Sequence, residues 1–240
     1  MSKEYKKTQL LRQYTTAPHP CSYLPDEEAS TLFVDPEADI SQSSYSYLTQ
    51  RGYRRSGHYI YKPDCLQCSA CLSLRIPVRQ YLFSRNDKRI FQRNRDLHHM
   101  QVDHIFENNF YQLYSDYITS RHQDGDMYPP SLDQYLSFLN NPFGNTEYHA
   151  FTDEQLKIKA VAVVDRLDDG LSAIYTFFDA QEDKRSLGTY AILWQIRQAQ
   201  QLGLDYVYLG YWVKQCPKMN YKTRFRPAEI LINQRWLTVT

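Results

Sequence analysis

The sequence predicts an α+β protein with a mixed-sheet core in its C-terminal half and a smaller α+β domain before it. Runs rich in aromatic and β-branched residues indicate strands, and apolar residues at helical spacing indicate a helix. In the C-terminal half these patterns give two strands, a loop, a helix and a third strand, expected at residues 158–167, 171–178, 185–189, 190–202 and 205–210. This order predicts a sheet with the helix packed against it.

The turns between these elements support the prediction. Asp168-Asp169-Gly170 is a hairpin signal, and Gly203 is the residue type that commonly follows a helix. The loop at residues 185–189 leaves the first amides of the next helix without intrahelical partners, and such amides hold anions or a polarised carbonyl oxygen. A last hairpin is expected at residues 229–239.

Short elements are predicted in the N-terminal part. Acidic residues at positions 26–28 resemble the first turn of a helix, and a helical turn is expected at residues 43–50. Aromatic residues on either side of Gly57 indicate two strands joined by a turn. A further strand is expected at residues 72–78 because of its β-branched and aliphatic content.

Two helices and a strand are predicted next, at residues 107–120, 131–139 and 148–152. The boundary between the two domains is expected near residues 98–106. The predicted N-terminal domain therefore covers residues 1–105, and the predicted catalytic domain covers residues 106–240.

The composition limits the classes of protein. The 240 residues contain 28 Lys and Arg against 27 Asp and Glu, a net charge of +1, so a nucleic-acid site has to be a local patch. No stretch approaches 18 uninterrupted apolar residues, and the first 16 residues contain no apolar run of the signal-peptide type. We therefore expect a cytoplasmic protein without a membrane partner, with its five cysteines as thiols.

Positive charge is concentrated in one helix-like stretch and the residues just before it. At helical spacing, at least two rows of basic side chains face one side of this helix. Such a strip can bind a phosphate backbone, and the alternative is an ordinary solvated face. The candidate nucleic-acid-binding residues are Arg79, Arg85, Lys88, Arg89 and Arg93, and the resemblance described below implies tRNA as their ligand.

A cysteine cluster is the candidate metal site. Cys65, Cys68 and Cys71 follow a Cys-x-x-Cys-x-x-Cys pattern, and Cys21 lies upstream. Three or four thiolates can hold zinc or an iron–sulfur cluster. The alternative is a set of free thiols beside a strand, with no metal. Cys216 lies far away in the sequence and is expected to be unrelated.

Several strings resemble a known family. Arg185-x-x-Gly188 resembles part of the phosphate-binding loop of GNAT-like N-acetyltransferases, whereas Tyr190 replaces the small residue that permits close approach of coenzyme A. The chain is similar to the aminoacyl-tRNA–protein transferases, and most similar to the bacterial aspartate/glutamate leucyltransferases. This similarity rests on Ser186-Leu187-Gly188 and on residues 52–57, 61–63, 208–213, 217–222 and 225–227.

The resemblance implies a GNAT-like C-terminal core and a specific reaction. Enzymes of this group transfer leucine from leucyl-tRNA to the N-terminal amine of proteins beginning with Asp or Glu, which marks these proteins for the N-degron pathway. No cofactor is implied, apart from the open question of zinc or an iron–sulfur cluster. Two alternatives are a coenzyme A-dependent N-acetyltransferase and a non-catalytic RNA-binding module that uses the basic helix.

The resemblance also suggests site residues. Asp165 is expected to orient or deprotonate the acceptor amine, with a strand-end role as the alternative, and Gly188 and Thr189 are expected to hold the ester carbonyl. Cations for the acceptor carboxylate are Arg54, Arg55, Arg75 and Arg226. Residues expected at the tRNA end or in an amino-acid pocket are Lys218, Tyr221, Lys222, Tyr175 and Tyr211.

Overall fold

A large mixed sheet forms the centre of the computed structural model, which describes residues 10–139 and 144–239. Most of the first 16 residues, in which the sequence analysis found no apolar run of the signal-peptide type, therefore lie outside the described residues. The eight strands of the sheet follow, in spatial order: β14 (Arg235–Val239), β13 (Ala228–Ile232), β7 (Leu72–Pro77), β12 (Tyr206–Trp212), β11 (Gly170–Phe178), β10 (Ile158–Arg166), β9 (Thr146–Thr152) and β8 (His98–Val102).

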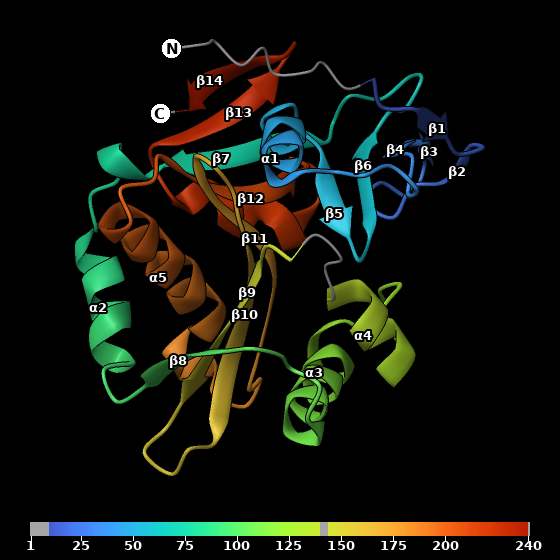
Figure 1. Cartoon of the computed structure of the whole chain (residues 1–240). Helices are drawn as coiled ribbons and strands as arrows, with labels where there is room; N and C mark the ends of the chain where they lie inside the picture. Colours follow the sequence, from blue (N-terminus) through green and yellow to red (C-terminus); the bar gives the residue numbers. More distant parts are fainter. Residues whose placement is uncertain (1–9, 140–143, 240) are drawn as a thin grey trace, which may run out of the picture.

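Helices cover both faces of this sheet (Figure 1). On one face lie α5 (Leu187–Gln201) and α2 (Arg85–Arg93), and on the other lie α3 (Asn108–Arg121) and α4 (Leu132–Leu139). The predicted α+β class with a GNAT-like mixed-sheet core is therefore confirmed.

A smaller sheet forms at the N-terminal end, beside α1 (Gln42–Gln50) and the pair β2 (His19–Pro20) and β3 (Glu28–Ala29). Its strands, in spatial order, are β1 (Gln13–Thr15), β4 (Thr31–Val34), β6 (Tyr59–Pro63) and β5 (Arg54–Ser56). The predicted helix start at residues 26–28 is wrong. The acidic residues there lead into β3 and β4, because pairing with distant strands outweighs the weak local helix signal.

The large sheet also contains strands from the N-terminal part. Both β7 and β8 precede residue 106, and β7 lies between β13 and β12. The boundary predicted near residues 98–106 therefore does not coincide with the division between the two sheets. Hydrophobic periodicity describes single elements, and it does not reveal which distant strand an element pairs with.

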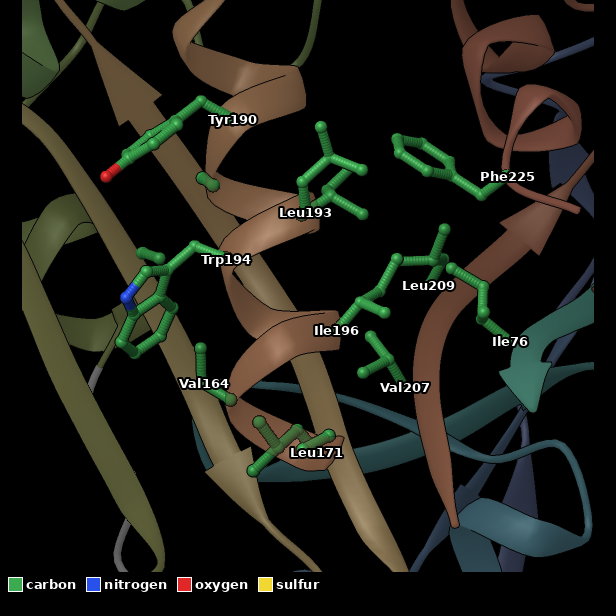
Figure 2. Close-up of a cluster of buried hydrophobic side chains, with 14 of the residues drawn as sticks. Ile76, Val164, Leu171, Tyr190, Leu193, Trp194, Ile196, Val207, Leu209 and Phe225 are labelled. Carbon is green, nitrogen blue, oxygen red and sulfur yellow. The ribbon is translucent and has the colours of Figure 1, made fainter. Parts of the chain in front are cut away.

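Helix α5 is the element around which the main core packs (Figure 2). Its Leu193 and Ile196 side chains are fully buried, facing Val207 and Leu209 of β12 and Phe225 after it. Burial of each such aliphatic side chain stabilises the fold by about 1.5–3 kcal/mol. These contacts fix the position of the loop before α5 relative to the sheet.

Helix α2 packs against α5 through Ile90 and Phe91. A capping box begins it: the Ser84 hydroxyl accepts from the Asp87 amide, and the Asp87 carboxylate accepts from the Ser84 amide. The helix predicted in this basic stretch is therefore confirmed. Elsewhere, no helix in residues 10–139 and 144–239 has the length and apolar character needed to span a membrane.

The strand pair β11 and β12 is the parallel pair of the large sheet. Their pairing begins at Gly170 with Tyr206 and ends at Ser172 with Tyr208, although β11 continues to Phe178 and β12 continues to Trp212. The two strands therefore separate beyond Ser172. We call this separation the strand opening.

A histidine pair at the β8–β9 edge makes stability depend on pH. Nε2 of His99 lies 3.1 Å from Nδ1 of His149, and Nε2 of His149 lies 3.2 Å from a Glu147 carboxylate oxygen. Burial and the neighbouring His149 lower the pKa of His99 to about 4. Between pH 6.5 and 4 the unfolded chain therefore binds a proton at this position that the folded chain does not.

We expect the free energy of unfolding to fall as pH decreases from 6.5 to 4. His99→Gln should flatten this slope, because glutamine does not titrate. Urea unfolding at pH 4.5, 5.5 and 6.5 measures the slope. His98 and His99 are both exposed at the level of the whole residue, but the His99 ring is the one that contacts His149. His98→Gln is therefore the matched control. If His99→Gln and the wild type show equal slopes, His99 is not the group that makes stability depend on pH in this range.

Candidate functional site

Arg54 fills the strand opening. This residue belongs to β5 of the small sheet and is 9% exposed. One guanidinium nitrogen donates to the Ser172 hydroxyl at 2.8 Å and another to the Ala173 carbonyl at 2.5 Å, both on β11. On β12, Gly210 has φ +77°, and a methyl group there would lie 3.1 Å from Nε of Arg54. Glycine thus leaves room for the guanidinium between the strands.

The charge of Arg54 has no carboxylate partner within ion-pair distance among residues 10–139 and 144–239. Its recorded hydrogen-bond partners are a hydroxyl and a carbonyl, which are neutral. A buried, uncompensated cation is costly unless it has a function or a ligand. The strand opening is therefore electropositive, and an anionic group bound beside Arg54 would compensate its charge.

Lys222 is a second buried cationic group at this position. It belongs to the 3₁₀ segment η3 (Pro217–Arg224), is 9% exposed, and donates a hydrogen bond from Nζ to the Tyr211 carbonyl at the end of β12. Burial, followed by the positive charge of Arg54, lowers the pKa of Lys222 to about 7. The sequence motif predicted Lys222 as a site residue, but it gave no indication that the side chain is buried.

Segment η3 connects three parts of the molecule. Lys218 forms an ion pair with Asp124 after α3 at 2.6 Å, and Arg224 donates to the Thr189 hydroxyl in the first turn of α5 at 3.3 Å. Between them, Tyr221 is 48% exposed, although burial of its hydroxyl raises its pKa. A ring that solvent can reach, with a hydroxyl that is largely desolvated, is suited to a ligand surface.

The N-terminus of α5 presents unpaired amides close to η3. Ser186 precedes the helix with φ 55° and makes no side-chain cap, and the amides of Leu187, Gly188 and Thr189 have no recorded acceptor among the described residues. The positive end of the helix dipole lies here. A methyl group on Gly188 would lie 2.9 Å from the Phe178 ring, so the loop packs closely on the end of β11.

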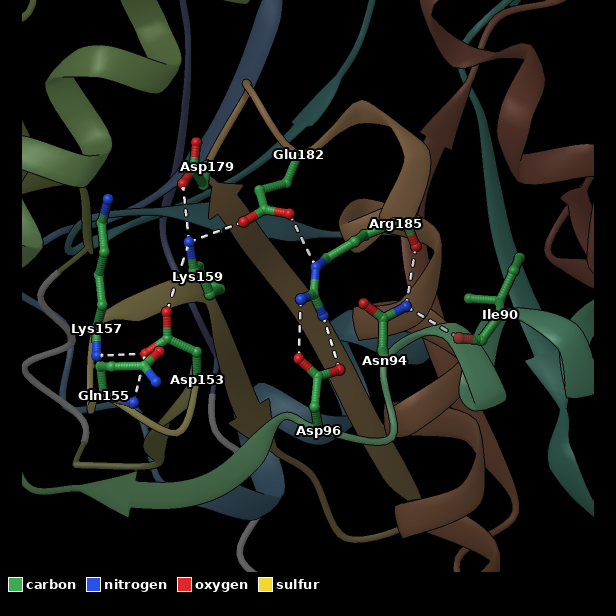
Figure 3. A network of polar contacts seen from close by, with 10 residues as sticks. All are labelled: Ile90, Asn94, Asp96, Asp153, Gln155, Lys157, Lys159, Asp179, Glu182 and Arg185. Carbon is green, nitrogen blue, oxygen red and sulfur yellow. Dashed lines mark hydrogen bonds and ion pairs between the residues drawn. The ribbon is translucent and has the colours of Figure 1, made fainter.

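An ion-pair network holds the loop before α5 (Figure 3). Arg185 donates to both carboxylate oxygens of Asp96 at 2.8 Å and to Glu182 at 2.9 Å, while the Asn94 amide donates to the Arg185 carbonyl at 2.9 Å. Lys159 of β10 reaches Glu182 at 2.8 Å. Hydrogen bonds from Arg185 lower the pKa of Asp96 below its usual range. Sequence reasoning missed Asp96, since nothing local marks it as a partner of Arg185.

Asp165 is engaged in a buried polar cluster. Its side chain is fully buried and accepts two hydrogen bonds from Arg55, at 2.5 and 2.8 Å. The Tyr45 hydroxyl, at 2.6 Å, and the Thr146 hydroxyl, at 2.7 Å, donate to the same carboxylate. Asp165 and Arg55 therefore join β10 to β5 as a buried ion pair, and their predicted roles toward the acceptor stay predictions.

Two further predicted ligands are engaged in packing. Arg75 pairs with Glu229 at 2.7 Å, and its guanidinium stacks between the rings of Tyr206 and Trp236. The Tyr211 hydroxyl donates to the Gly52 carbonyl at 2.8 Å, which ties β12 to the N-terminal part. These contacts give Arg75 and Tyr211 a part in holding the fold, and the substrate-binding roles predicted for them stay predictions.

Tyr175 and Arg226 are the two other residues to which the sequence analysis assigned substrate contacts. Tyr175, on β11 beyond the strand opening, packs beside Tyr117 of α3, and its hydroxyl is a buried group without a recorded partner in the described residues. Arg226 is exposed, and its Nε donates to the Thr223 carbonyl of η3. Both roles stay predictions.

The predicted tRNA-binding residues divide into two groups. Arg85, Lys88 and Arg89 are exposed on α2, and Arg93 at its end is exposed and donates to the Lys184 carbonyl in the loop before α5. Arg79 lies near the opposite end of α5, where it pairs with Asp205 at 2.6 Å. Its charge is thus already compensated, which separates it from the strip on α2.

The cysteine cluster does not form a metal site in this structure. Burial and the neighbouring thiols raise the pKa of Cys71 to about 12, and those neighbours are Cys21, Cys65, Cys68 and Cys216. Within residues 10–139 and 144–239, no group of three His, Cys, Asp or Glu side chains is arranged to hold a metal ion. The candidate metal ligands therefore do not fit one. Cys216, although distant in the sequence, is thus also among the neighbours of Cys71.

Known proteins similar to this chain cover nearly all of it. The family described as "Arginine-tRNA-protein transferase, C terminus" matches residues 109–232, and "Arginine-tRNA-protein transferase, N terminus" matches residues 19–89. The aspartate/glutamate leucyltransferase of Pseudomonas fluorescens (strain Pf0-1) is 52% identical over 95% of this chain and 97% of its own. That of Hahella chejuensis is 51% identical over 94% of this chain and 96% of its own.

Solved structures give only distant likenesses. L-PGS from Bacillus licheniformis has a TM-score of 0.44 at 11% identity, covering 59% of this chain and 46% of that one. A GCN5-related glucosamine N-acetyltransferase region of a fungal multi-domain β-N-acetylglucosaminidase has a TM-score of 0.44 at 9% identity, covering 84% and 22%. The family matches and the relatives at about 50% identity, and not these structures, confirm the resemblance found in the sequence. This chain belongs to the arginine-tRNA-protein transferase family.

Proposed function

We propose that this protein transfers leucine from leucyl-tRNA to the N-terminal amine of proteins that begin with Asp or Glu. The observation that carries the proposal is the 52% identity to an aspartate/glutamate leucyltransferase along 97% of that relative. We further propose that the reaction takes place in the cytoplasm and marks its products for degradation through the N-degron pathway.

The first turn of α5 is the proposed binding position for the donor ester. The amides of Gly188 and Thr189 are without acceptors among the described residues and lie at the positive end of the helix. Amides in this arrangement stabilise the negative charge that develops on a carbonyl oxygen under attack. The exposed strip of Arg85, Lys88 and Arg89 on α2 would then bind the phosphate backbone of the tRNA.

Arg54 is the proposed cation for the acceptor side chain. Of the arginines suggested for this role, Arg55 and Arg75 are paired with Asp165 and Glu229, whereas Arg54 bonds only to neutral groups. A carboxylate at the strand opening would compensate its charge in a planar, two-point contact. This would explain a preference for acceptors that begin with Asp or Glu.

Direct attack needs no covalent intermediate on the enzyme. The aminoacyl ester is already activated, so alignment of the amine and the ester can supply a large part of the rate acceleration. Lys218 and Tyr221 on η3 are the proposed contacts for the end of the tRNA, and Tyr175 beyond the strand opening is the proposed wall of the leucine pocket.

We expect transfer of labelled leucine from leucyl-tRNA to peptides beginning with Asp and Glu, and none to peptides beginning with Asn, Lys or Arg. Asp and Asn peptides form the matched pair, because they differ in charge and hardly in shape. Thin-layer or mass-spectrometric detection of the leucylated peptide measures the result.

Other outcomes would point to the alternatives. Transfer of acetyl from acetyl-coenzyme A would indicate an N-acetyltransferase, and RNA binding without any transfer would indicate a binding module. Transfer to Lys and Arg peptides alone would contradict the proposed acceptor specificity.

A further inference from the structure

Lys222 is buried at the strand opening, where the roles proposed above leave its amine unused. Its Nζ donates to the Tyr211 carbonyl, at the point where β12 ends and η3 begins. No carboxylate lies within ion-pair distance of this Nζ in the part of the chain that the structure describes. A lysine buried without a counter-ion favours its neutral form, and a neutral amine has a lone pair that can accept a proton.

The groups facing Lys222 come from three places. Arg54 approaches from β5 and disfavours the proton on Lys222, while Cys216, from the loop before η3, has the opposite effect. The ring of Tyr221 lies 5.9 Å from Nζ and is 48% exposed, so the amine sits just behind a surface that solvent reaches. The site thus combines a base, a fixed cation and an accessible aromatic wall.

We propose that Lys222 accepts a proton from the N-terminal ammonium group of the acceptor protein and so frees the amine that attacks the leucyl ester. This inference rests on the proposed leucine transfer. An N-terminal amine has a pKa of about 7.7–8 and is mostly protonated at pH 7, so a base is needed before attack.

Proton transfer to Lys222 precedes bond formation. The ammonium proton moves to neutral Lys222, and the free amine forms a bond to the ester carbonyl carbon. The bond between this carbon and the ribose oxygen then breaks, and the second proton of the attacking nitrogen leaves with that oxygen as the tRNA hydroxyl. Lys222 returns its proton to solvent before the next turnover.

Arg54 links this base to acceptor choice. Its positive charge is one of the causes that keep the pKa of Lys222 low, at about 7. An acceptor carboxylate bound to Arg54 would compensate that charge, and Lys222 would become a stronger base. An acidic acceptor would therefore both bind at the strand opening and increase the basicity of the group that deprotonates it.

The test is the pH dependence of kcat for leucine transfer to an Asp peptide between pH 6 and 9, at saturating leucyl-tRNA and peptide. For the wild type, kcat should rise with pH and then level off. The midpoint should lie above the value of about 7 for Lys222 in the free enzyme, because the bound acceptor carboxylate compensates the charge of Arg54. Lys222→Met should lower the turnover rate about 100-fold and remove this rise. Lys222→Arg keeps the charge and a donor for the Tyr211 carbonyl, but it should lose as much activity, because arginine stays protonated.

Two controls separate a base from a structural residue. Lys214→Met, an exposed lysine eight positions earlier, should keep the wild-type kcat and pH profile. Arg54→Gln should move the midpoint of the remaining activity to higher pH, since it removes a cation beside Lys222. If the wild type transfers leucine and Lys222→Arg keeps its turnover rate within about 3-fold of the wild type with the same profile, this inference is overturned alone. If the wild type transfers no leucine, the proposed function is overturned and this inference with it.

Discussion

Asp165→Asn is expected to destabilise the protein by about 3–5 kcal/mol, because it removes the carboxylate charge that pairs with the buried Arg55 guanidinium. Asparagine keeps the shape of the side chain and one acceptor oxygen, so the loss of stability reports mainly the removal of the negative charge. The Tyr45 and Thr146 hydroxyls would compete for that single oxygen. Urea denaturation at pH 7 measures the loss as a lower transition midpoint.

The double variant Arg55→Met with Asp165→Leu provides the comparison. Removing both charges should recover much of the lost stability, since the buried guanidinium that lost its carboxylate is then removed as well. Recovery should be incomplete, because two hydroxyls lose their acceptor. If the double variant loses as much stability as two severe single variants added together, the broken ion pair is not the cause of the destabilisation.

The Asp165→Asn variant also distinguishes a structural Asp165 from a catalytic one. At a temperature where this variant is folded, its turnover rate for leucine transfer should stay within a few-fold of the wild type. The reason is that the carboxylate contacts Arg55, Tyr45 and Thr146, and none of these is a proposed substrate contact. If the folded variant instead turned over at least about 100-fold more slowly, a role in deprotonating the acceptor would be restored.

Arg54→Gln is expected to lower kcat/KM for an Asp peptide about 100-fold or more, and to remove most of the discrimination between Asp and Asn peptides. Loss of one partner from a buried charge pair typically has an effect of this size. The variant should act on acceptor recognition, so leucyl-tRNA binding, measured by filter retention, should be unchanged.

Arg54→Lys and Arg235→Gln complete the comparison. Lysine keeps the charge but not the planar two-point contact, so discrimination should be reduced and not abolished. Arg235 is exposed on β14, and Arg235→Gln should behave as the wild type. If folded Arg54→Gln still prefers Asp over Asn as strongly as the wild type, another cation binds the acceptor carboxylate, and exposed Arg226 is the next candidate.

The local elements were largely predictable from the sequence. Helices α2 and α5 and the hairpin of β10 and β11 were expected because helical spacing, the glycine after α5 and the Asp-Asp-Gly turn are short-range signals. The helix start predicted at residues 26–28 is absent for the opposite reason, because long-range contacts decide the conformation there. Three acidic residues stabilise a helix start only weakly, and strand pairing decided the conformation there.

The candidate site was predictable only in part. The strings around Gly188 and Lys222 pointed to the correct segments, and η3 does approach the first turn of α5 through Arg224 and Thr189. The sequence could not tell that Arg54 is without a carboxylate partner while Arg55, its neighbour, is paired with a residue 110 positions away. Adjacent residues on a strand point to opposite faces, and their surroundings depend on the whole fold.

By itself, the sequence determined the α+β class, the order of the elements and the family, because these depend on local patterns and on strings of neighbouring residues. Only the tertiary structure decided which charges are compensated and where β11 and β12 separate. Whether an arginine or a lysine can act on a substrate depends on which distant carboxylates and carbonyls the fold places beside it, and that is a property of long-range packing.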